Sequence, residues 1–384
     1  MKRIWILFLL LLCAAACDSQ EEREKNRHMV LLYCAGNNSL ASDLVYNYSQ
    51  IKDSWLPGEK ATDQILLIYK HIRGSEPMLV RLSRDRKGNP VETVIRTYPE
   101  STGSARAETL RTVIADAEAA WPSARHSLIL WSHATGYLPS GYYGSPTDKA
   151  SAQNEAAPLS FGQDSDTKEE MEITELREAL SAIHYELILF DCCFMGNVET
   201  AYELRNNCDY LVASAAEIIS DGFPYGTIIE PMFSQQAEEA ARTLCRNYME
   251  YYRRHSNPYA TISLVKTSEL DRLAAACKPV FANHREAIRT LDRSQIQAYH
   301  RFSGMYWFYD LDDFVGRVAT DEEYRTFLSA LDRTVLYKDA TEMFINLKIN
   351  HYSGLSVYIP RDGYANLNSF YQTLQWNKAT GLVP

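Results

Sequence analysis

The sequence lacks an excess of basic residues. Lys and Arg number 39 against 49 Asp and Glu, so the formal net charge at pH 7 is −10. Proteins that bind nucleic acid need a basic footprint, and this composition therefore argues against a nucleic-acid partner. The same negative charge leaves room for a cationic substrate at an acidic site.

Cysteine spacings typical of a metal knuckle are also missing. Two of the eight cysteines lie in the amino-terminal segment, and the other six are scattered in apolar surroundings: Cys34, Cys192, Cys193, Cys208, Cys245 and Cys277. Such thiols are typical of single buried cysteines, even in an exported protein. We predict neither a metal site nor a disulfide framework.

Long hydrophobic runs and internal repeats are absent after residue 17. With 46% hydrophobic residues the chain can still bury a large core. Its length fits one large α/β domain with appendages.

The amino terminus has the pattern of an export signal. Lys2 and Arg3 precede an apolar run, residues 4–13, that is too short to span a bilayer as a stable helix. The following residues 14–17, Ala-Ala-Ala-Cys, resemble a bacterial lipoprotein box. The resemblance implies cleavage before Cys17 and lipid on its sulfur; the alternative is ordinary secretion with cleavage near Ala16.

We therefore expect a lipid-anchored protein of the bacterial cell envelope, with the outer membrane as the expected membrane. Residues 18–27 are polar and charged, which favours a flexible tether. The domain itself is expected to span residues 28–384 and to be monomeric.

From residue 28 onward, apolar runs of strand length alternate with amphipathic segments of helix length. This alternation is typical of an α/β fold with a parallel sheet. The expected strands are 28–34, 64–70, 78–82, 91–97, 127–131, 187–190, 210–214, 261–266 and 354–360, and the expected helices include 105–121, 172–183 and 237–252.

The most informative stretch is LILFDCCFMGN, residues 187–197. A wholly apolar run fits a strand covered on both faces. It ends in Asp191, Cys192 and Cys193, and ligands of open α/β sheets bind at the carboxyl ends of strands. Strand alternation puts Asp191 and Cys193 on one face and Cys192 on the other, which makes Cys193 the candidate nucleophile.

A second strand end carries His133. Because one helix separates the strands before His133 and Cys193, a right-handed crossover predicts parallel neighbours whose carboxyl ends meet. An imidazole beside a thiol can take its proton during attack on a carbonyl carbon. A cysteine phosphatase is excluded because no Arg follows Cys193 at the required spacing, where Val198 and Glu199 stand. A zinc site is disfavoured because adjacent cysteines on a strand point apart.

Five segments together resemble the clostripain family of cysteine peptidases, which is caspase-like in fold. They are YCAGNNSL, LILWSH, LILFDCCFMGNVETAYEL, YLVAS with DGFPY after it, and SGLSVYIP. The resemblance implies a three-layer α/β/α sandwich with a mostly parallel central sheet and a helical carboxyl-terminal extension. It also implies an endopeptidase that cuts after Arg or Lys, and it leaves the choice between these two residues open. The resemblance allows calcium dependence, although the sequence offers no clear calcium site.

By the same resemblance His133 is the catalytic base, Cys193 the nucleophile, and the backbone N–H groups of Ala134 and Cys193 hold the oxyanion. Asp191 and Asp221 match acids of the pocket for the residue before the scissile bond, and Ser214 matches a substrate-binding position.

Besides Cys192, which stands where the family tends to have Ala before the nucleophile, the chain departs from the family pattern at three positions. Ala134 replaces a glycine, which would cost energy if the loop needs a positive φ. Ala215 and Ala216 stand where acids are expected. These departures favour the alternative of a weak or inactive surface-tethered relative that binds peptide or protein partners.

Residues 141–170 are rich in small and polar residues, which predicts a long exposed loop. Family members are commonly processed between the His and Cys strands, so we expect self-cleavage between Lys149 and Ala150. The competing site, Lys168, has acidic neighbours. Asp164 and Asp166 are reminiscent of a calcium loop, but the glycine that such a loop needs is missing.

The tether can be tested by metabolic labelling with a fatty-acid analogue. The label should tag the wild-type protein and miss Cys17→Ser, because the acyl chains supply the membrane affinity. A soluble, unlabelled wild-type protein in the medium would instead indicate simple secretion.

Overall fold

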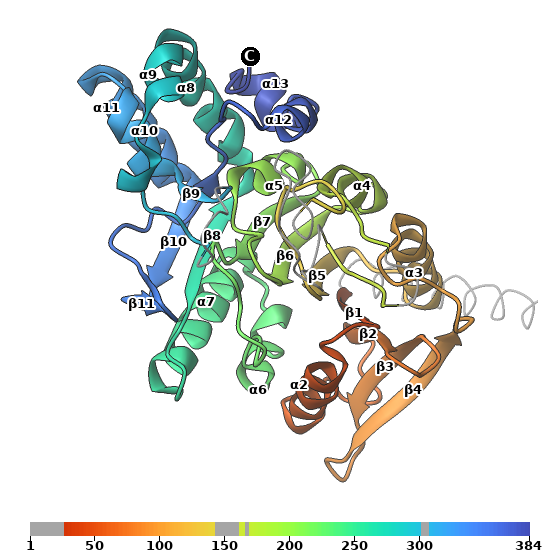
Figure 1. Cartoon of the computed structure of the whole chain (residues 1–384). Helices are drawn as coiled ribbons and strands as arrows, with labels where there is room; N and C mark the ends of the chain where they lie inside the picture. The colour runs from red at the N-terminus through yellow and green to blue at the C-terminus, as the bar shows by residue number, and fades with distance from the viewer. Residues whose placement is uncertain (1–26, 143–160, 166–168, 301–306) are drawn as a thin grey trace, which may run out of the picture.

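A nine-stranded sheet in the order β10-β8-β7-β6-β5-β1-β2-β3-β4 runs through the protein (Figure 1). This computed structural model describes residues 27–142, 161–165, 169–300 and 307–384. The strands are β1 (His28–Gly36), β2 (Gln64–Ile72), β3 (Met78–Arg84), β4 (Pro90–Thr97), β5 (Arg125–Trp131), β6 (Tyr185–Asp191), β7 (Cys208–Ala213), β8 (Thr261–Lys266) and β10 (Val335–Ala340). Strands β2, β1, β5, β6 and β7 are parallel, and the edge strands pair antiparallel.

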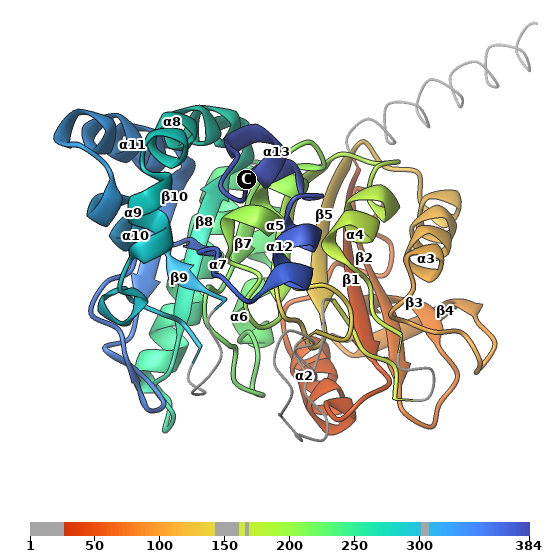
Figure 2. The same ribbon diagram turned by 45° about the horizontal axis from the view of Figure 1, so that its top comes forward.

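Helices cover both faces of the sheet, which confirms the predicted α/β/α sandwich. One face carries α3 (Ala107–Ala120), α4 (Ile173–Ala179), α5 (Val198–Glu203) and α8 (Leu270–Asn283). The other carries α2 (Ala41–Asp53), α6 (Tyr225–Ile228) and α7 (Ala237–Arg254) (Figure 2). Because side chains alternate along β6, Ile188 and Phe190 enter one core while Leu187 and Leu189 enter the other.

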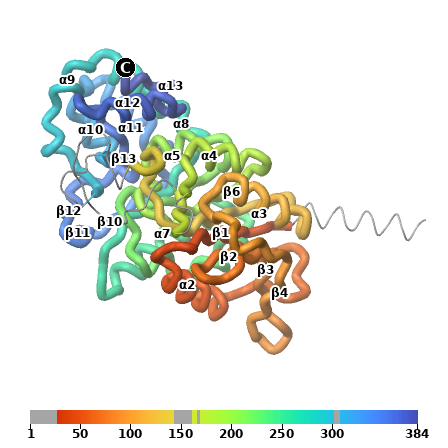
Figure 3. Tube along the Cα trace, turned by 45° about the vertical axis from the view of Figure 1, so that its right-hand side comes forward, coloured from red at the N-terminus to blue at the C-terminus, as the bar shows by residue number. Residues whose placement is uncertain are grey.

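The carboxyl-terminal part is largely helical, as predicted. It comprises α9 (Arg285–Thr290), α10 (Leu311–Val318), α11 (Asp321–Thr334), α12 (Ala365–Tyr371) and α13 (Gln375–Thr380), with two small sheets, β9 (Tyr309–Asp310) with β13 (Ser356–Val357) and β11 (Met343–Phe344) with β12 (Leu347–Lys348). Helix α11 packs at the β10 end of the sheet (Figure 3), whereas α13 packs on α5 and α8. Three short 3-10 helices complete the described elements: η1 (Pro231–Phe233), η2 (Thr267–Glu269) and η3 (Arg293–Gln295).

The predicted strand 354–360 is shorter than expected and lies outside the central sheet. Only β13 is a strand, and it pairs with β9. Gly354 has a φ of +94°, outside the extended region, and Pro360 lacks an N–H for a ladder. The edge position belongs instead to β10, whose partly exposed residues lack the apolar run used to recognise strands.

Two buried acids of α5 hold the carboxyl-terminal part in place. The Tyr358 N–H and the Tyr371 hydroxyl donate to Glu199 Oε1 over 2.8 and 2.6 Å. The Gln375 N–H donates to Glu203 Oε1 over 2.6 Å. Burial raises the pKa of Glu199 to about 7. The helix that follows the cysteine motif is thus tied to the chain's last two helices.

The loop 141–170 is not exposed along its whole length, contrary to the prediction. Phe161 is buried and bridges both Ala134 and Met171. Asp164 is also buried, and its two carboxylate oxygens accept hydrogen bonds from the Ser104 hydroxyl and the Ala105 N–H, each over 2.9 Å. The sequence misled because small and polar residues dominate the segment, whereas Tyr142, Phe161 and Asp164 are buried.

The six cysteines in the described ranges are all free thiols. Among those ranges, none of the helices has the length and apolar character needed to cross a membrane.

Candidate active site

Three strand ends bring the chemical groups together. In the parallel ladder Cys34 of β1 pairs with Trp131 of β5, and Trp131 pairs with Asp191 of β6. His133 lies two residues after Trp131, and Cys193 lies two residues after Asp191. The predicted neighbouring strands are confirmed, and β1 lies beside β5 at the point where the strand order reverses, which is where α/β sheets build their sites.

The two adjacent cysteines have different surroundings. Cys192 is buried, its thiol lies 3.1 Å from the Leu130 carbonyl oxygen, and burial raises its pKa well above the usual value. Cys193 is partly exposed, and its sulfur accepts a hydrogen bond from the Ile218 N–H over 3.3 Å. Cys193 is therefore the thiol that a substrate can reach.

Strand alternation is not what places Cys193. β6 ends at Asp191, and the chain then turns through Phe194, a non-glycine residue with a φ of +60°. Such a conformation persists only where the surroundings fix it. The Phe194 N–H donates to the Ala216 carbonyl over 2.9 Å, and its ring stacks on Phe308 with centroids 4.6 Å apart.

The turn that follows β5 (residues 132–136, the His turn) packs directly on the turn that follows β6 (residues 192–197, the Cys turn). A Cβ atom at Gly136, whose φ is +63°, would stand 2.7 Å from both the Phe194 oxygen and Asn197 Nδ2. Asn197 Nδ2 donates to that same Phe194 oxygen over 2.7 Å, and its Oδ1 caps α5 by accepting from the Thr200 N–H. Only glycine at position 136 permits this approach.

Ala134 does not suffer the strain that its replacement of glycine suggested. Among the described residues, the non-glycine residues with positive φ are Phe194 and Ile345, so Ala134 has ordinary backbone geometry. The adjacent His133 carbonyl accepts from the Gly162 N–H over 3.0 Å. Within the described ranges no acceptor takes the Ala134 N–H. The positive φ of this turn falls on Gly136 instead.

The His133 ring is tied to a residue that the sequence argument missed. Its Nε2 lies 2.8 Å from Ser39 Oγ, on the segment that follows β1. Burial lowers the pKa of His133 to about 4, so the ring is neutral at pH 7 and can accept a proton. The one available signal was the segment YCAGNNSL, which contributes to the family resemblance but carried no assigned role.

Asp191 lies beneath the site. Its Oδ2 accepts from the Tyr225 hydroxyl over 2.9 Å and from the Phe223 N–H over 3.2 Å. Burial raises the pKa of Asp191 to about 6, although both hydrogen bonds oppose the rise. The carboxyl is therefore charged at pH 7 and loses its charge as the pH falls through 6. A Cβ atom at Gly222 would stand 2.7 Å from Oδ2, so the loop closes on the acid only without a side chain.

Asp221 is the more accessible acid. Its Oδ2 lies 3.2 Å from His255 Nε2 and accepts from the Tyr251 hydroxyl over 3.3 Å. The Asp221 carbonyl accepts from Asn47 Nδ2 over 3.0 Å, and Asn47 Oδ1 accepts from the Trp131 indole over 3.0 Å. This chain of bonds couples the Asp221 loop to the end of β5.

Ser214 and the two alanines after it are buried. Ser214 Oγ lies 2.7 Å from Thr261 Oγ1, which also accepts from the Ala216 N–H over 3.1 Å. The Ser214 carbonyl accepts from the Gly196 N–H over 2.7 Å. The segment thus supports the Cys turn through its backbone, and a substrate contact of the Ser214 hydroxyl requires the bond with Thr261 to open.

Among the described residues, one group of side chains outside the site could hold a metal ion. One ligand atom each of Asp310, Asp312 and His351 lies within 4.8 Å of the others. His351 Nε2 lies 2.9 Å from Asp312 Oδ2, while Asp310 accepts from the Tyr299 hydroxyl and the Ser353 N–H. Each of these three side chains therefore already has a hydrogen-bond partner within the protein. The predicted loop acid Asp164 is likewise occupied by Ser104 and Ala105.

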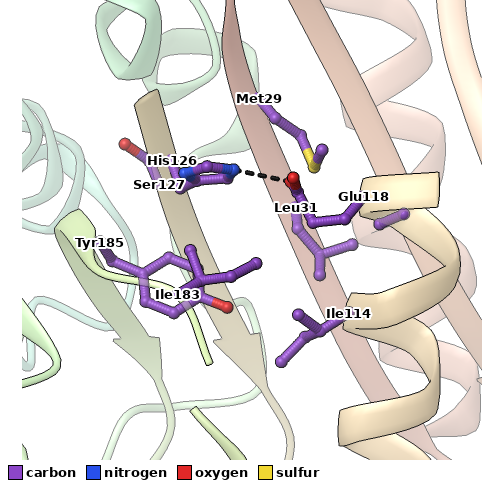
Figure 4. Close-up of a pocket in the computed structure, with 9 residues that line it drawn as sticks. Met29, Leu31, Ile114, Glu118, His126, Ser127, Ile183 and Tyr185 are labelled. Atoms are coloured by element: carbon purple, nitrogen blue, oxygen red, sulfur yellow. Dashed lines mark hydrogen bonds and ion pairs between the residues drawn. The ribbon is translucent and has the colours of Figure 1, made fainter. Parts of the chain in front are cut away.

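A small pocket lies at the opposite edge of the sheet (Figure 4). It is lined at the amino ends of β1, β5 and β6 by residues that include Met29, Ser127 and Tyr185, and His126 Nε2 lies 2.6 Å from Glu118 Oε1 beside it. Because His133 and Cys193 follow the carboxyl ends of the strands, this pocket is separate from the candidate active site.

The predicted residues Cys17, Lys149 and Ala150 lie outside the described ranges, as do Asp166 and Lys168. The structure brings together His133, Cys193, Ala134, Asp191, Asp221 and Ser214 around the ends of β5, β6 and β7, and it adds Ser39 and Gly136.

Comparisons with known proteins agree with this geometry. The model of the clostripain family matches residues 32–380. An inactive zymogen C11 protease from Parabacteroides distasonis is 32% identical, with 92% of this chain and 97% of that chain covered and a TM-score of 0.79. A secreted C11 cysteine protease from Bacteroides thetaiotaomicron, solved with an irreversible peptide inhibitor, is 26% identical over 92% and 99% of the chains, with a TM-score of 0.77.

A clostripain from Bacteroides thetaiotaomicron in complex with the peptide inhibitor BTN-VLTK-AOMK is 29% identical, covering 57% of this chain and 99% of that chain with a TM-score of 0.50. The search of curated proteins finds no match.

The different surroundings of the two thiols give a direct test. Cys193→Ala should abolish peptide hydrolysis, whereas Cys192→Ala should retain most of it, because the buried Cys192 thiol contacts only the protein interior. Rates on a reporter peptide, with thermal unfolding as a control for folding, check this. A dead Cys192→Ala beside an active Cys193→Ala would mean that the assignment is off by one residue.

Proposed function

Because this chain belongs to the clostripain family of cysteine peptidases, we propose that it is an endopeptidase that cuts after Arg or Lys with His133 and Cys193. The observation that carries the proposal is the pairing of Trp131 with Asp191 in the parallel ladder. This pairing brings the neutral imidazole of His133 and the accessible thiol of Cys193 to one edge of the sheet. A Cys and a His at one such edge suffice for acyl transfer.

The residues divide the chemistry as follows. The Cys193 thiol proton passes to His133 as sulfur bonds the carbonyl carbon, and the carbonyl electron pair moves to oxygen. The N–H groups of Ala134 and Cys193 stabilise that oxyanion. The electron pair on the oxyanion then re-forms the carbonyl and the C–N bond breaks. The amine leaves with the proton from His133. Water, deprotonated by His133, hydrolyses the thioester and regenerates the thiol.

Two carboxylates support recognition of a cationic side chain. Asp191 supplies a buried charge above pH 6, and Asp221 supplies a more exposed one. A buried carboxylate without a cation of its own favours a ligand that brings one. Among the relatives, the clostripain from Bacteroides thetaiotaomicron was solved with an inhibitor whose peptide part, VLTK, ends in lysine. Ser214 belongs to the same region through its support of the Cys turn.

The proposal includes the anchor and the cellular location. Lipid on Cys17 would hold the monomeric domain at the cell envelope, on a tether of residues 18–27, where protein and peptide substrates are available. The alternative, a relative that binds peptides without cutting them, loses one of its supports because Ala134 has ordinary backbone geometry.

Specificity can be tested at the accessible acid. Asp221→Asn should raise KM for Arg and Lys reporter peptides by about tenfold or more, since losing a charge partner of a cation typically costs about 2 to 5 kcal/mol at a buried site and less at a half-exposed one. Neutral reporters should change little.

Asp209→Asn is the matched control, because Asp209 also pairs with a histidine, His184, over 2.9 Å, and lies at the start of β7. An equal loss for neutral and cationic peptides would assign Asp221 to structure. A wild-type protein that binds these peptides and hydrolyses none would favour the binding alternative.

We also propose that the chain is a zymogen that cleaves itself after Lys149. The sequence offers a basic residue followed by small Ala150 in a polar segment, and a protease needs extended backbone that can leave the surface. The flanking Glu169 and Glu170 disfavour Lys168, because a site built from Asp191 and Asp221 repels acidic neighbours. The uncut segment joins the strands that precede His133 and Cys193, and its cleavage would release activity.

Intact mass spectrometry decides whether self-cleavage occurs. The wild type should give two fragments divided at Lys149, and Cys193→Ala a single chain. Lys149→Ala should remain uncut, while Lys168→Ala should be cut like the wild type. A fully active wild type that stays in one piece would contradict the proposal.

A further inference from the structure

Ser39 occupies a place next to His133 that the topology of the sheet creates. β1 and β5 are parallel neighbours, so the residues that follow them emerge at the same edge. Ser39 comes three residues after the end of β1 and His133 two residues after the end of β5. Ser39 Oγ lies 2.8 Å from Nε2 of the His133 ring.

The backbone around Ser39 is fixed although its side chain is exposed. Asn38 Nδ2 donates to the Ala35 carbonyl over 2.9 Å and to the Gln163 carbonyl over 3.1 Å, and Asn38 Oδ1 accepts from the Leu40 N–H over 2.9 Å. The Asn37 carbonyl accepts from the Ser165 N–H over 2.7 Å. These bonds hold the segment from both sides, so the backbone of Ser39 has a defined position beside the turn that carries His133.

A neutral imidazole carries one proton on one of its two nitrogens. A general base must offer its lone pair to the thiol, so the proton has to sit on the other nitrogen and needs an acceptor there. Nε2 is the nitrogen bonded to Ser39, and a serine hydroxyl can accept through oxygen. The remaining nitrogen, Nδ1, is then the one left to take the proton of the thiol.

We propose that Ser39 is a positioning residue of this site: its oxygen accepts the Nε2–H of His133 and thereby holds the ring in the tautomer whose Nδ1 can deprotonate Cys193. The catalytic role of Ser39 rests on the proposed peptidase function, whereas the tautomer of His133 does not depend on that function. When Nδ1 takes the thiol proton the ring becomes a cation, and the Nε2–H remains bonded to a neutral oxygen. Ser39 therefore fixes orientation without contributing a counter-charge.

Kinetics form the first test. Ser39→Ala should lower kcat about tenfold with KM nearly unchanged, since one hydrogen bond to the base is lost and no substrate contact is. Ser39→Thr, which keeps the hydroxyl, should restore most of the rate. Ser49→Ala is the matched control, because exposed Ser49 donates only to the Tyr46 carbonyl of its own helix. An unchanged kcat in Ser39→Ala would overturn the proposal.

A spectroscopic readout separates this inference from the peptidase function. In ¹⁵N-histidine-labelled Cys193→Ala protein, the His133 Nε2 signal should be that of a protonated nitrogen and Nδ1 that of a lone pair, with His133→Ala identifying the signals. Adding Ser39→Ala should mix the two tautomers. A protonated Nδ1 would overturn the proposal. A wild type without hydrolytic activity, but with the expected tautomer, would refute the peptidase function and support the role of Ser39.

Discussion

The parallel ladder of β1, β5 and β6 determines where the turns that carry Ser39, His133 and Cys193 lie. Its register aligns Cys34, Trp131 and Asp191, so the turns that follow these strands meet at one edge of the sheet. Site residues on loops need a rigid scaffold to position them, and strands buried on both faces supply it. The site depends on this register because a slip by one residue between β5 and β6 would shift the turns that carry His133 and Cys193 past each other.

Much of this could be predicted from sequence, for a physical reason. Apolar runs such as residues 187–190 identify buried strands, and the residue after a buried strand is at the carboxyl edge wherever the strand lies in the sheet. That rule found His133 and Cys193. It could not find Ser39, because the bond between Ser39 and His133 depends on which strands are neighbours and on how far each turn extends.

Other features escaped because they depend on close packing between distant segments. Gly136 looks like an ordinary turn residue, and only the position of the Phe194 carbonyl shows why a side chain is excluded there. Phe161 and Asp164 belong to a polar stretch, yet one is buried against the His turn and the other against the start of α3. Composition describes a segment on average and cannot indicate which of its members enters the core.

The order of the sheet has a consequence for any cut in the segment between Tyr142 and Phe161. Such a cut would leave His133 on one polypeptide and Cys193 on another, since β5 and β6 precede and follow that segment. The two pieces would remain paired through the β5–β6 ladder and the cores on both faces. Refolding would then change from a unimolecular to a bimolecular reaction, because the covalent connection no longer limits the entropy of bringing these strands together. After dilution from denaturant, a cut enzyme would recover at a rate that depends on its concentration, as a heterodimer does.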